Sequence, residues 1–344
     1  MTEVIIVGSG PAGMSAAFFL SLNDVKVTVM ERLSNERYNG YHEICGGGIS
    51  RRAFRELKPM RPSGVLNEIE HTRIVWPDGT VVKMRTKGYI IHRPTFLSNL
   101  KKECEDRGVS FVKGSVTDVS YGGRYTVLTS SGDSFSADWL IGADGCCSVV
   151  RKKLFGTSPA LRIPATEYII EGRRTDDLEI RLLSDGGGTY TWSFPRGPNT
   201  GTGGMKGYHE DDSMMKGSRF IPVGGVGRIV NGRAMLIGDA AAMANPVSFG
   251  GLKAALLSGK KACESVVRGD PERIQRWWDG SILSDRRFMD FNDTLRGWTT
   301  EEMNDAVRPF RHGGIYLPGI WACLSRPKNI RMYFGCLFAF RYGW

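Results

Sequence analysis

Three glycines and a glutamate near the start of the chain form its clearest chemical pattern. The apolar run Val4–Val7 leads directly into a turn that contains Gly8, Gly10 and Gly13. In a dinucleotide site, the first glycine allows a tight turn, the second lets the backbone approach a pyrophosphate, and the third lets a helix pack closely on a strand. Glu31 ends the next apolar run, where a carboxylate can accept a hydrogen bond from a ribose 2′-hydroxyl. The spacing predicts a dinucleotide site, because an ordinary glycine turn does not explain Glu31.

Two later apolar runs also end in small turns that carry an aspartate. Asp144-Gly145 follows one run, and Gly238-Asp239 follows the other. Such a carboxylate can contact a ribitol or ribose hydroxyl, and a helix that follows can direct its N-terminal N–H groups at a pyrophosphate or a flavin ring. Taken alone, each aspartate could instead cap a helix. Together with the glycine turn, the two elements favour a nucleotide site built at strand ends.

These residues require strands that end together and helices that begin beside them. The sequence predicts strands at 4–7, 25–30, 109–112, 125–129, 139–141 and 234–237, and helices at 14–22, at 94–107, directly after 237 and across 272–298. Alternation typical of β-strands occurs within 66–88 and 157–222. We expect an α/β chain with α+β elements. It would comprise a discontinuous Rossmann-like nucleotide domain (1–65, 89–155 and 226–270), an inserted β-rich substrate domain (66–88 and 156–225) and a helical, apolar C-terminal region (271–344). The functional pocket is expected between the first two domains.

The composition argues against a disulfide-rich secreted protein, a metalloprotein and a membrane-spanning protein. The chain has 344 residues, of which 41% are hydrophobic and 24% charged, as in a globular protein of one large or two ordinary domains. Its seven cysteines show no metal-type spacing, so we expect reduced thiols, no metal site and a cytoplasmic protein. The first strand begins too early to leave room for a signal peptide. No apolar stretch reaches the ~18–20 residues of a membrane-spanning helix.

The net charge of +10 has several interpretations. It can serve solubility, attract anionic lipid headgroups, or attract an acidic electron-donor protein. Nucleic acid is not expected as a partner, because the basic residues are scattered and no binding motif accompanies them.

The C-terminal segments 315–324 and 332–340 are strongly apolar, and Arg326, Lys328, Arg331 and Arg341 interrupt or flank them. Packing against the body of the protein is the default interpretation. The alternative is peripheral contact with a membrane surface, with the cations at the level of the headgroups and the aromatic rings below them.

The chain resembles the FAD-dependent oxidoreductases of the para-hydroxybenzoate hydroxylase type. The resemblance lies in the order and spacing of three elements: the glycine turn with Glu31, Asp144-Gly145 and Gly238-Asp239. The resemblance covers about residues 1–265 and implies that the nucleotide domain binds FAD rather than NAD. It also implies that Arg93 lies near the FAD. The residues expected to contact FAD are Gly8, Gly10, Pro11, Ala12, Gly13, Glu31, Arg32, Cys45, Gly46, Gly47, Arg93, Val116, Asp144, Gly145, Gly238, Asp239, Gly250 and Gly251.

Two shorter motifs resemble the geranylgeranyl reductases within that class. Cys45-Gly46-Gly47 is similar to a Cys-Gly-Gly element of that family, and residues 190–195 are similar to its Tyr-x-Trp-x-Phe-Pro element. The resemblance implies that reduced FAD saturates isoprenoid double bonds in lipids or in chlorophyll and quinone side chains. The first element would lie by the flavin, and the second would line the substrate cavity.

The chain departs from that family at two places. Residues 186–188 are glycines where the family usually has a proline shortly before the tyrosine. Phe249-Gly250-Gly251 stands where the family usually has Gly-Glu-Gly, which removes a carboxylate from the vicinity of the flavin.

The candidate catalytic and substrate-lining residues each have a structural alternative. The Cys45 thiol could protonate a substrate carbon or orient the flavin, or it could be an inert residue in a flexible loop. Tyr190 is a second catalytic candidate. With Trp192 and Phe194 it shares one face of a predicted strand, which could form an aromatic wall for an apolar chain or simply part of the sheet core. His42 could line the substrate site or be structural.

These observations favour an FAD-dependent reductase that saturates the C=C bonds of an isoprenoid lipid or side chain with hydride from reduced flavin. Its electron donor would be NAD(P)H or an acidic ferredoxin-like protein. The alternatives are a flavin monooxygenase or halogenase on the same fold, and a non-catalytic flavin- or lipid-binding protein. An aerobic monooxygenase would consume NADPH and oxygen, which separates it from the reductase.

Overall fold

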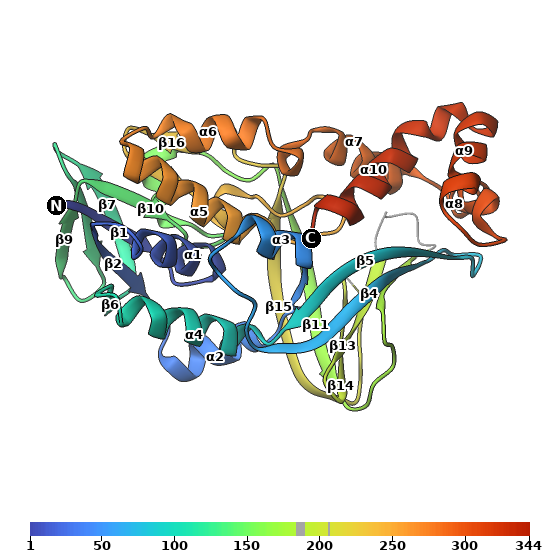
Figure 1. The fold of residues 1–344 in the computed structure, drawn as a ribbon, viewed down its shortest axis with the longest axis horizontal. Helices are drawn as coiled ribbons and strands as arrows, with labels where there is room; N and C mark the ends of the chain where they lie inside the picture. The colour runs from blue at the N-terminus through green and yellow to red at the C-terminus, as the bar shows by residue number, and fades with distance from the viewer. Residues whose placement is uncertain (184–189, 206) are drawn as a thin grey trace.

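A six-stranded sheet forms the nucleotide-binding half of the protein in this computed structural model, which describes residues 1–183, 190–205 and 207–344 (Figure 1). Its strands, in spatial order, are β16 (Val230–Asn231), β17 (Ala234–Leu236), β10 (Trp139–Gly142), β1 (Thr2–Val7), β2 (Val25–Glu31) and β6 (Ser110–Lys113). All neighbouring pairs are parallel except β16 and β17. Parallel strands end at one edge of a sheet, and ligands of such sheets bind beyond that edge.

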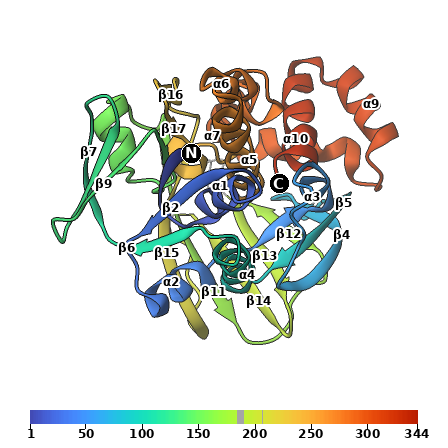
Figure 2. The same cartoon turned by 60° about the vertical axis from the view of Figure 1, so that its left-hand side comes forward.

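Helices and a small sheet cover the two faces of this parallel sheet. One face is covered by α1 (Pro11–Leu20), α4 (Arg93–Glu105) and α5 (Leu252–Arg268). On the other side lies an antiparallel sheet of β7 (Val116–Tyr121), β8 (Tyr125–Thr129) and β9 (Ser134–Ala137) (Figure 2). Apolar residues of all these elements belong to one buried core, which holds the strand ends in place.

The second sheet has eight strands from two separate parts of the chain. In spatial order they are β15 (Ser213–Val223), β11 (Leu161–Ile170), β14 (Asn199–Gly204), β13 (Tyr190–Arg196), β12 (Leu178–Leu182), β4 (Val65–Val75), β5 (Val81–Ile91) and β3 (Gly48–Ser50). Only the β12–β4 pair is parallel. The two β-type segments expected from the sequence therefore join in one sheet. β3 also extends this sheet, although residues 48–50 were assigned to the nucleotide domain. The proposed division into domains otherwise stays a prediction.

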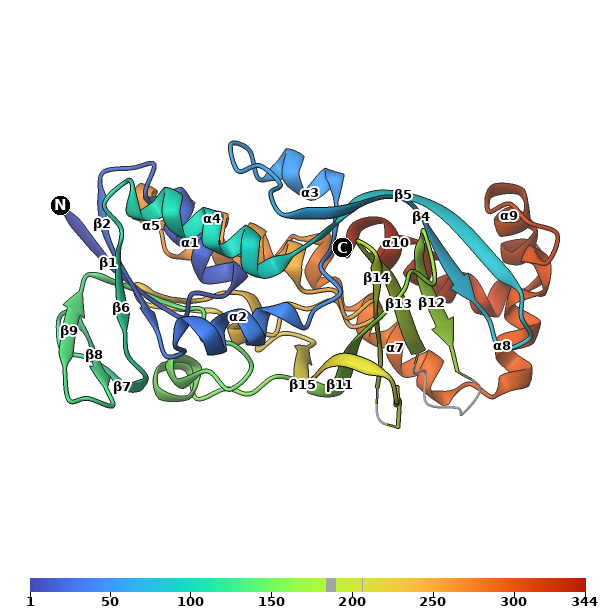
Figure 3. The ribbon, with the colours of Figure 1, turned by 90° about the horizontal axis from the view of Figure 1, so that it is seen from below.

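The remaining helices are mostly short. They are α2 (Asn35–Glu43), α3 (Arg51–Glu56), a π-helical turn (Arg151–Phe155), α6 (Glu272–Asp279), α7 (Arg287–Gly297), α8 (Thr300–Val307), α9 (Tyr316–Ser325) and α10 (Ile330–Tyr342), with 3-10 turns at Gly238–Ala241, Ile282–Ser284, Arg308–Phe310 and Pro327–Asn329. Buried residues of α7, α8 and α10 form a second core with the eight-stranded sheet. Figures 1 and 3 place the N-terminus and α9 at opposite ends of the molecule.

The expected α/β fold class is confirmed, but two helices differ from expectation. The helix predicted directly after residue 237 is wrong, since β17 is followed by a single 3-10 turn and α5 begins only at Leu252. Pro246 and the left-handed backbone of Ala242 and Phe249 prevent a regular helix in between. The helix expected across 272–298 is interrupted by the 3-10 turn that follows Gly280.

Candidate active site

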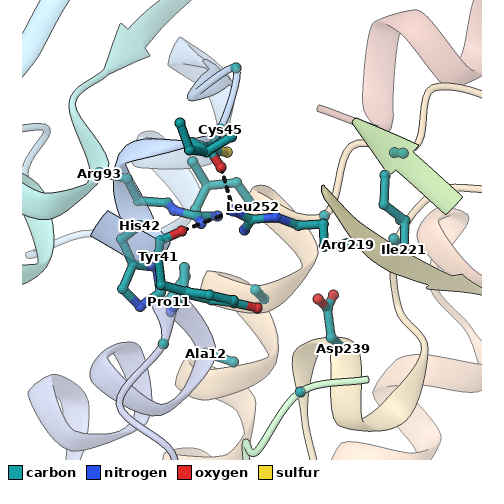
Figure 4. A pocket seen from close by; sticks show the side chains of 18 of the residues that line it. Pro11, Ala12, Tyr41, His42, Cys45, Arg93, Arg219, Ile221, Asp239 and Leu252 are labelled. Atoms are coloured by element: carbon teal, nitrogen blue, oxygen red, sulfur yellow. Dashed lines mark hydrogen bonds between the residues drawn. The ribbon is translucent and has the colours of Figure 1, made fainter. Parts of the chain in front are cut away.

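A cavity of about 420 Å³ lies between the carboxyl ends of the parallel strands and the eight-stranded sheet (Figure 4). Most residues singled out from the sequence line it. These are Gly8, Gly10, Pro11, Ala12, Glu31, Arg32, His42, Cys45, Gly46, Gly47, Arg93, Val116, Asp144, Gly145, Tyr190, Trp192, Phe194, Asp239, Gly250 and Gly251. Gly13 and Gly238 lie behind the cavity wall instead.

The two glycines behind the wall let backbone segments approach one another. A Cβ on Gly13 would collide with the carbonyl oxygen of Gly8, whose own φ is +98°. A Cβ on Gly238 would lie 2.7 Å from the Cβ of Ala12. Gly10 differs, because its nearest neighbour would be His42 Cε1 at 3.9 Å, which is ordinary contact. The free space at Gly10 faces the cavity, as a close-approaching ligand requires.

Glu31 is held in place by the glycine turn. Its Oε2 accepts hydrogen bonds from the Ser9 amide (3.0 Å) and hydroxyl (2.7 Å), and its Oε1 accepts one from the Leu33 amide (2.9 Å). A carboxylate has about four acceptor positions, so these bonds leave capacity for a ribose hydroxyl. The sequence pattern identified Glu31 but gave no sign of Ser9 or Leu33.

Asp144 has a structural role and a free oxygen. Its Oδ2 accepts from the amides of Val149 (2.6 Å) and Val150 (3.2 Å), which lie five and six residues further on. Asp144 is therefore not an N-cap, which accepts from two or three residues on; a bond of that kind is made by the Ser148 hydroxyl, which accepts from the Arg151 amide (2.9 Å). Its Oδ1 is buried with no hydrogen-bond partner in the described part of the chain, and burial raises the pKa of the carboxyl. The fully buried Arg151 donates to Cys146 O (2.6 Å) and Ala240 O (2.8 Å), which joins this turn to the Asp239 turn.

Two arginines and Asp239 face one another across the middle of the cavity (Figure 4). Burial raises the pKa of Asp239, and the charges of Arg93 and Arg219 oppose that shift. Arg93 Nε and Nη2 are buried and unpartnered within residues 1–183, 190–205 and 207–344. Unpaired buried donors are costly unless a ligand satisfies them. Together with Asp144 Oδ1 and the space at Gly10, they fit a bound dinucleotide that carries phosphates and hydroxyls.

His42 lies beside the glycine turn, 3.9 Å from the Cβ position of Gly10. Burial lowers its pKa to about 2, and the neighbouring Arg93 and Arg219 lower it further. The imidazole is therefore neutral at physiological pH and does not serve as a proton donor there. Its ring contacts those of Tyr38 and Tyr41 edge-on, which fits the structural alternative for this residue.

A charged network that the sequence did not reveal attaches the segment 41–45 to the large sheet. Arg219 Nη2 donates to Tyr41 O (2.9 Å) and Ile44 O (2.6 Å). Arg196 pairs with Glu43 and donates to the carbonyl of Cys45 at 3.2 Å. No local motif indicates these contacts, because β13 and β15 meet this segment only in the folded chain.

The Cys-Gly-Gly element and the aromatic element touch directly. A Cβ on Gly46 would overlap the ring of Phe194, and a Cβ on Gly47 would collide with the carbonyl oxygen of Ile91. Gly47 also has a φ of +67°, a conformation that favours glycine. The Cys45 Sγ accepts a hydrogen bond from the Gly47 amide at 3.4 Å. The glycines thus let Cys45 lie in a tight turn against the aromatic strand.

The predicted aromatic strand is present as β13. Tyr190 stacks on Phe249 with the ring centroids 5.4 Å apart, and it contacts Trp192 edge-on. Burial raises the pKa of Tyr190, so its hydroxyl stays protonated. Aliphatic residues of the same sheet, including Ile180 and Ile221, continue this wall. The departure at residues 186–188 lies outside the described residues.

Glu167 is a cavity residue that sequence reasoning missed. It lies on β11, paired with Gly203 of β14 and Gly217 of β15. Its Oε1 is buried and has no hydrogen-bond partner among the described residues. Burial raises its pKa to about 7, although Arg196, Arg219 and Arg93 pull it downward. A carboxyl group of that pKa can release and regain a proton near neutral pH.

Comparison with known proteins agrees with this site. Residues 1–74 match the model of an FAD binding domain. The chain is 27% identical to digeranylgeranylglycerophospholipid reductase 1 of Methanopyrus kandleri, over 78% of this chain and 81% of that protein. It is also 27% identical to the menaquinone reductase of Mycobacterium tuberculosis, over 83% and 80% of the two chains.

A solved structure shares the fold over almost the whole chain. A geranylgeranyl bacteriochlorophyll reductase-like protein of Thermoplasma acidophilum superposes with a TM-score of 0.77 at 19% identity, covering 94% of this chain and 95% of the other. The fold and the site thus define an FAD-dependent oxidoreductase. Within that class, the chain is similar in sequence to digeranylgeranylglycerophospholipid reductases and in fold to a geranylgeranyl bacteriochlorophyll reductase-like protein, and its cofactor is FAD.

Proposed function

We propose that this flavoprotein saturates C=C bonds of an isoprenoid, geranylgeranyl-type lipid or side chain. The observation that carries the proposal is the contact between Gly46 and Phe194, which brings the Cys-Gly-Gly turn and the aromatic wall to one cavity. An apolar wall suits a polyprenyl chain, because burying such a chain is favourable by ~25 cal/mol per Å². The names of the reductases from Methanopyrus and Mycobacterium support the same substrate class.

Saturation adds one hydride and one proton across a double bond, and reduced FAD supplies the hydride when it is bound. The residues of the chain have the other tasks. Tyr190, Trp192 and Phe249 exclude water and orient the alkene. The proton comes from the Cys45 thiol, from Glu167 or from a water that either one holds. Arg93, Asp144 and Glu31 hold the nucleotide portion of the cofactor.

The partners of the proposed reaction follow from its electron balance. The oxidised cofactor must regain two electrons, from a nicotinamide nucleotide or from an acidic ferredoxin-like protein attracted by the net charge of +10. We place the protein in the cytoplasm, in peripheral contact with a membrane that contains its substrate.

Anaerobic turnover tests the proposal. The FAD-loaded protein is reduced with dithionite, freed of excess reductant and mixed with a geranylgeranyl lipid. We expect the absorbance of oxidised flavin to return with the lipid only, and the product to gain two hydrogens per reduced bond. Reoxidation that requires oxygen and yields a hydroxylated or halogenated product would assign the site to a monooxygenase or halogenase. Reoxidation that no lipid accelerates would indicate a binding protein.

Replacement of the thiol tests the proton source. We expect Cys45→Ser to bind FAD within about threefold of the parent, since a hydroxyl can also accept the hydrogen bond from the Gly47 amide. Single-turnover reoxidation by the lipid should slow by at least about tenfold, because the serine hydroxyl is a much weaker acid than the thiol. Stopped-flow spectroscopy measures the reoxidation rate of the parent and of the variant. An unchanged rate would remove Cys45 as the proton donor and leave Glu167 or water.

A further inference from the structure

Helix α9 presents an unusual apolar surface to solvent. Leu317, Trp321 and Leu324 are 79%, 61% and 73% exposed, and Tyr316 and Ile320 are also exposed. Their spacing places all five on one side of the helix. We call these five residues the α9 face. Large apolar side chains gathered in this way usually mark an interaction site.

Basic residues border the α9 face at both ends. Arg308 precedes the helix in a 3-10 turn, while Lys328 and Arg331 follow it in the next 3-10 turn and in α10. All three of these neighbouring segments contact α9. The three side chains are exposed and form no ion pair within residues 1–183, 190–205 and 207–344. A nearby carboxylate, Asp305 of α8, is paired with Arg326, which lowers its pKa together with the more weakly acting Arg308 and Lys328, so the positive charge of the three side chains is only partly offset.

The charge distinguishes between two possible occupants of the α9 face. In a symmetric dimer, the same patch of both copies would meet, so like charges at Arg308, Lys328 and Arg331 would be brought together. An anionic lipid surface instead neutralises them, at about 1 kcal/mol for each cation near the surface. None of the described helices is long and apolar enough to cross a bilayer, so contact through α9 would be peripheral.

We infer that the α9 face docks on an anionic lipid bilayer, with its apolar side chains below the headgroups and Arg308, Lys328 and Arg331 among the phosphates. Aromatic and aliphatic side chains on a short helix, bordered by cations, suit this interfacial position. α9 contacts α10 and the 3-10 turn Arg308–Phe310 that follows α8, and both α8 and α10 pack on the eight-stranded sheet that lines the cavity. The lipid would thus meet the protein at the end away from the N-terminus (Figures 1 and 3).

The purpose of this docking rests on the proposed function, since an isoprenoid lipid must be drawn from a bilayer, but the docking itself can be measured without substrate. The FAD-loaded protein is sedimented with vesicles of phosphatidylcholine alone or mixed with phosphatidylglycerol. We expect binding to the anionic vesicles only. Leu317→Ser/Trp321→Ser should weaken it by at least about tenfold. The matched control is Tyr121→Ser, since Tyr121 is similarly exposed at 63% and ends β7, a strand that Figure 1 shows at the opposite end of the molecule from α9.

Charge reversal provides the second test. Lys328→Glu/Arg331→Glu should lose most of the salt-sensitive part of the binding and keep its FAD and its turnover of detergent-solubilised lipid. The inference would be overturned if the parent and the Leu317→Ser/Trp321→Ser variant bound anionic vesicles equally well. It would also be overturned if the parent did not bind anionic vesicles. A parent dimer that Leu317→Ser/Trp321→Ser converts to monomer would also overturn it and assign the α9 face to a second copy. Vesicle binding without lipid reduction would contradict the proposed function alone.

Discussion

Gly10→Ala is expected to lose FAD while its apoprotein stays as stable as the parent. The backbone of Gly10 has a φ of −64°, which alanine adopts without strain, and the new methyl group would meet only His42 Cε1 at 3.9 Å. The same methyl would occupy the space through which the backbone approaches the pyrophosphate. Overpacking of that kind costs about 3 kcal/mol, which corresponds to about 100-fold in the dissociation constant of FAD.

Two other glycines make the comparison specific. Gly13→Ala should destabilise the apoprotein itself by about 3 kcal/mol, because its Cβ collides with the carbonyl oxygen of Gly8. Gly40→Ala in α2 is the neutral control, since no atom would lie within 4 Å of its Cβ. Quenching of flavin fluorescence gives the affinity, and urea unfolding of the apoprotein gives the stability. If Gly10→Ala binds FAD like the parent, the pyrophosphate does not lie against Gly10.

The parts of the site that could be predicted from the sequence are those carried by local backbone geometry. Gly8, Gly13 and Glu31 occur in a strand–turn–helix unit whose conformation depends on neighbouring residues, and the spacing therefore indicates it. The aromatic strand could be predicted for the same reason, because alternation places Tyr190 and Trp192 on one face. Close contacts that only a glycine permits, such as that of Gly46 with the Phe194 ring, become visible only in the folded chain.

The parts that could not be predicted depend on residues far apart in the sequence. Arg219 and Arg196 reach the 41–45 segment from strands more than 150 positions later, and neither belongs to a motif. Trp344, at the other end of the chain, also lines the cavity. The late start of α5 was missed because the small residues after Asp239 favour a helix locally. Pro246 is visible in the sequence, but the left-handed backbone of Ala242 and Phe249, which also delays the helix until Leu252, is seen only in the structure.

The same limit explains why Glu167 was overlooked. In the sequence it is one of two charged residues within the range of β11, and it belongs to no motif. In the structure it faces the cavity that also contains Cys45 and Gly250. The family resemblance implies a carboxylate at the position where this chain has Gly250. Glu167 gives the cavity an acidic group from a different strand.

Glu167→Gln is expected to make the apoprotein more stable at pH 8 and to leave it unchanged at low pH. The pKa of Glu167 is about 7 in the folded protein, against a usual value of 4.5 in the unfolded chain. Between these values the unfolded chain has released the proton and the folded protein still holds it, so the parent loses stability as the pH rises. A difference of this size amounts to about 3 kcal/mol above pH 7. Glutamine does not ionise and avoids the loss.

Urea unfolding of both apoproteins at several pH values between 4 and 8 measures this difference (roughly the range over which the two pKa values act). The control is Glu171→Gln, because Glu171 is exposed near the end of the same strand and its replacement should change stability by less than about 0.5 kcal/mol at any pH. Parallel pH profiles for the parent and Glu167→Gln would show that the carboxyl is ionised in the folded state. Stability profiles of the parent and Glu167→Gln that converge at low pH and separate at high pH would instead establish a neutral acid inside the cavity. A neutral acid there can donate a proton to an alkene carbon and recover one from solvent. The proposed reduction requires a proton donor of this kind in the cavity.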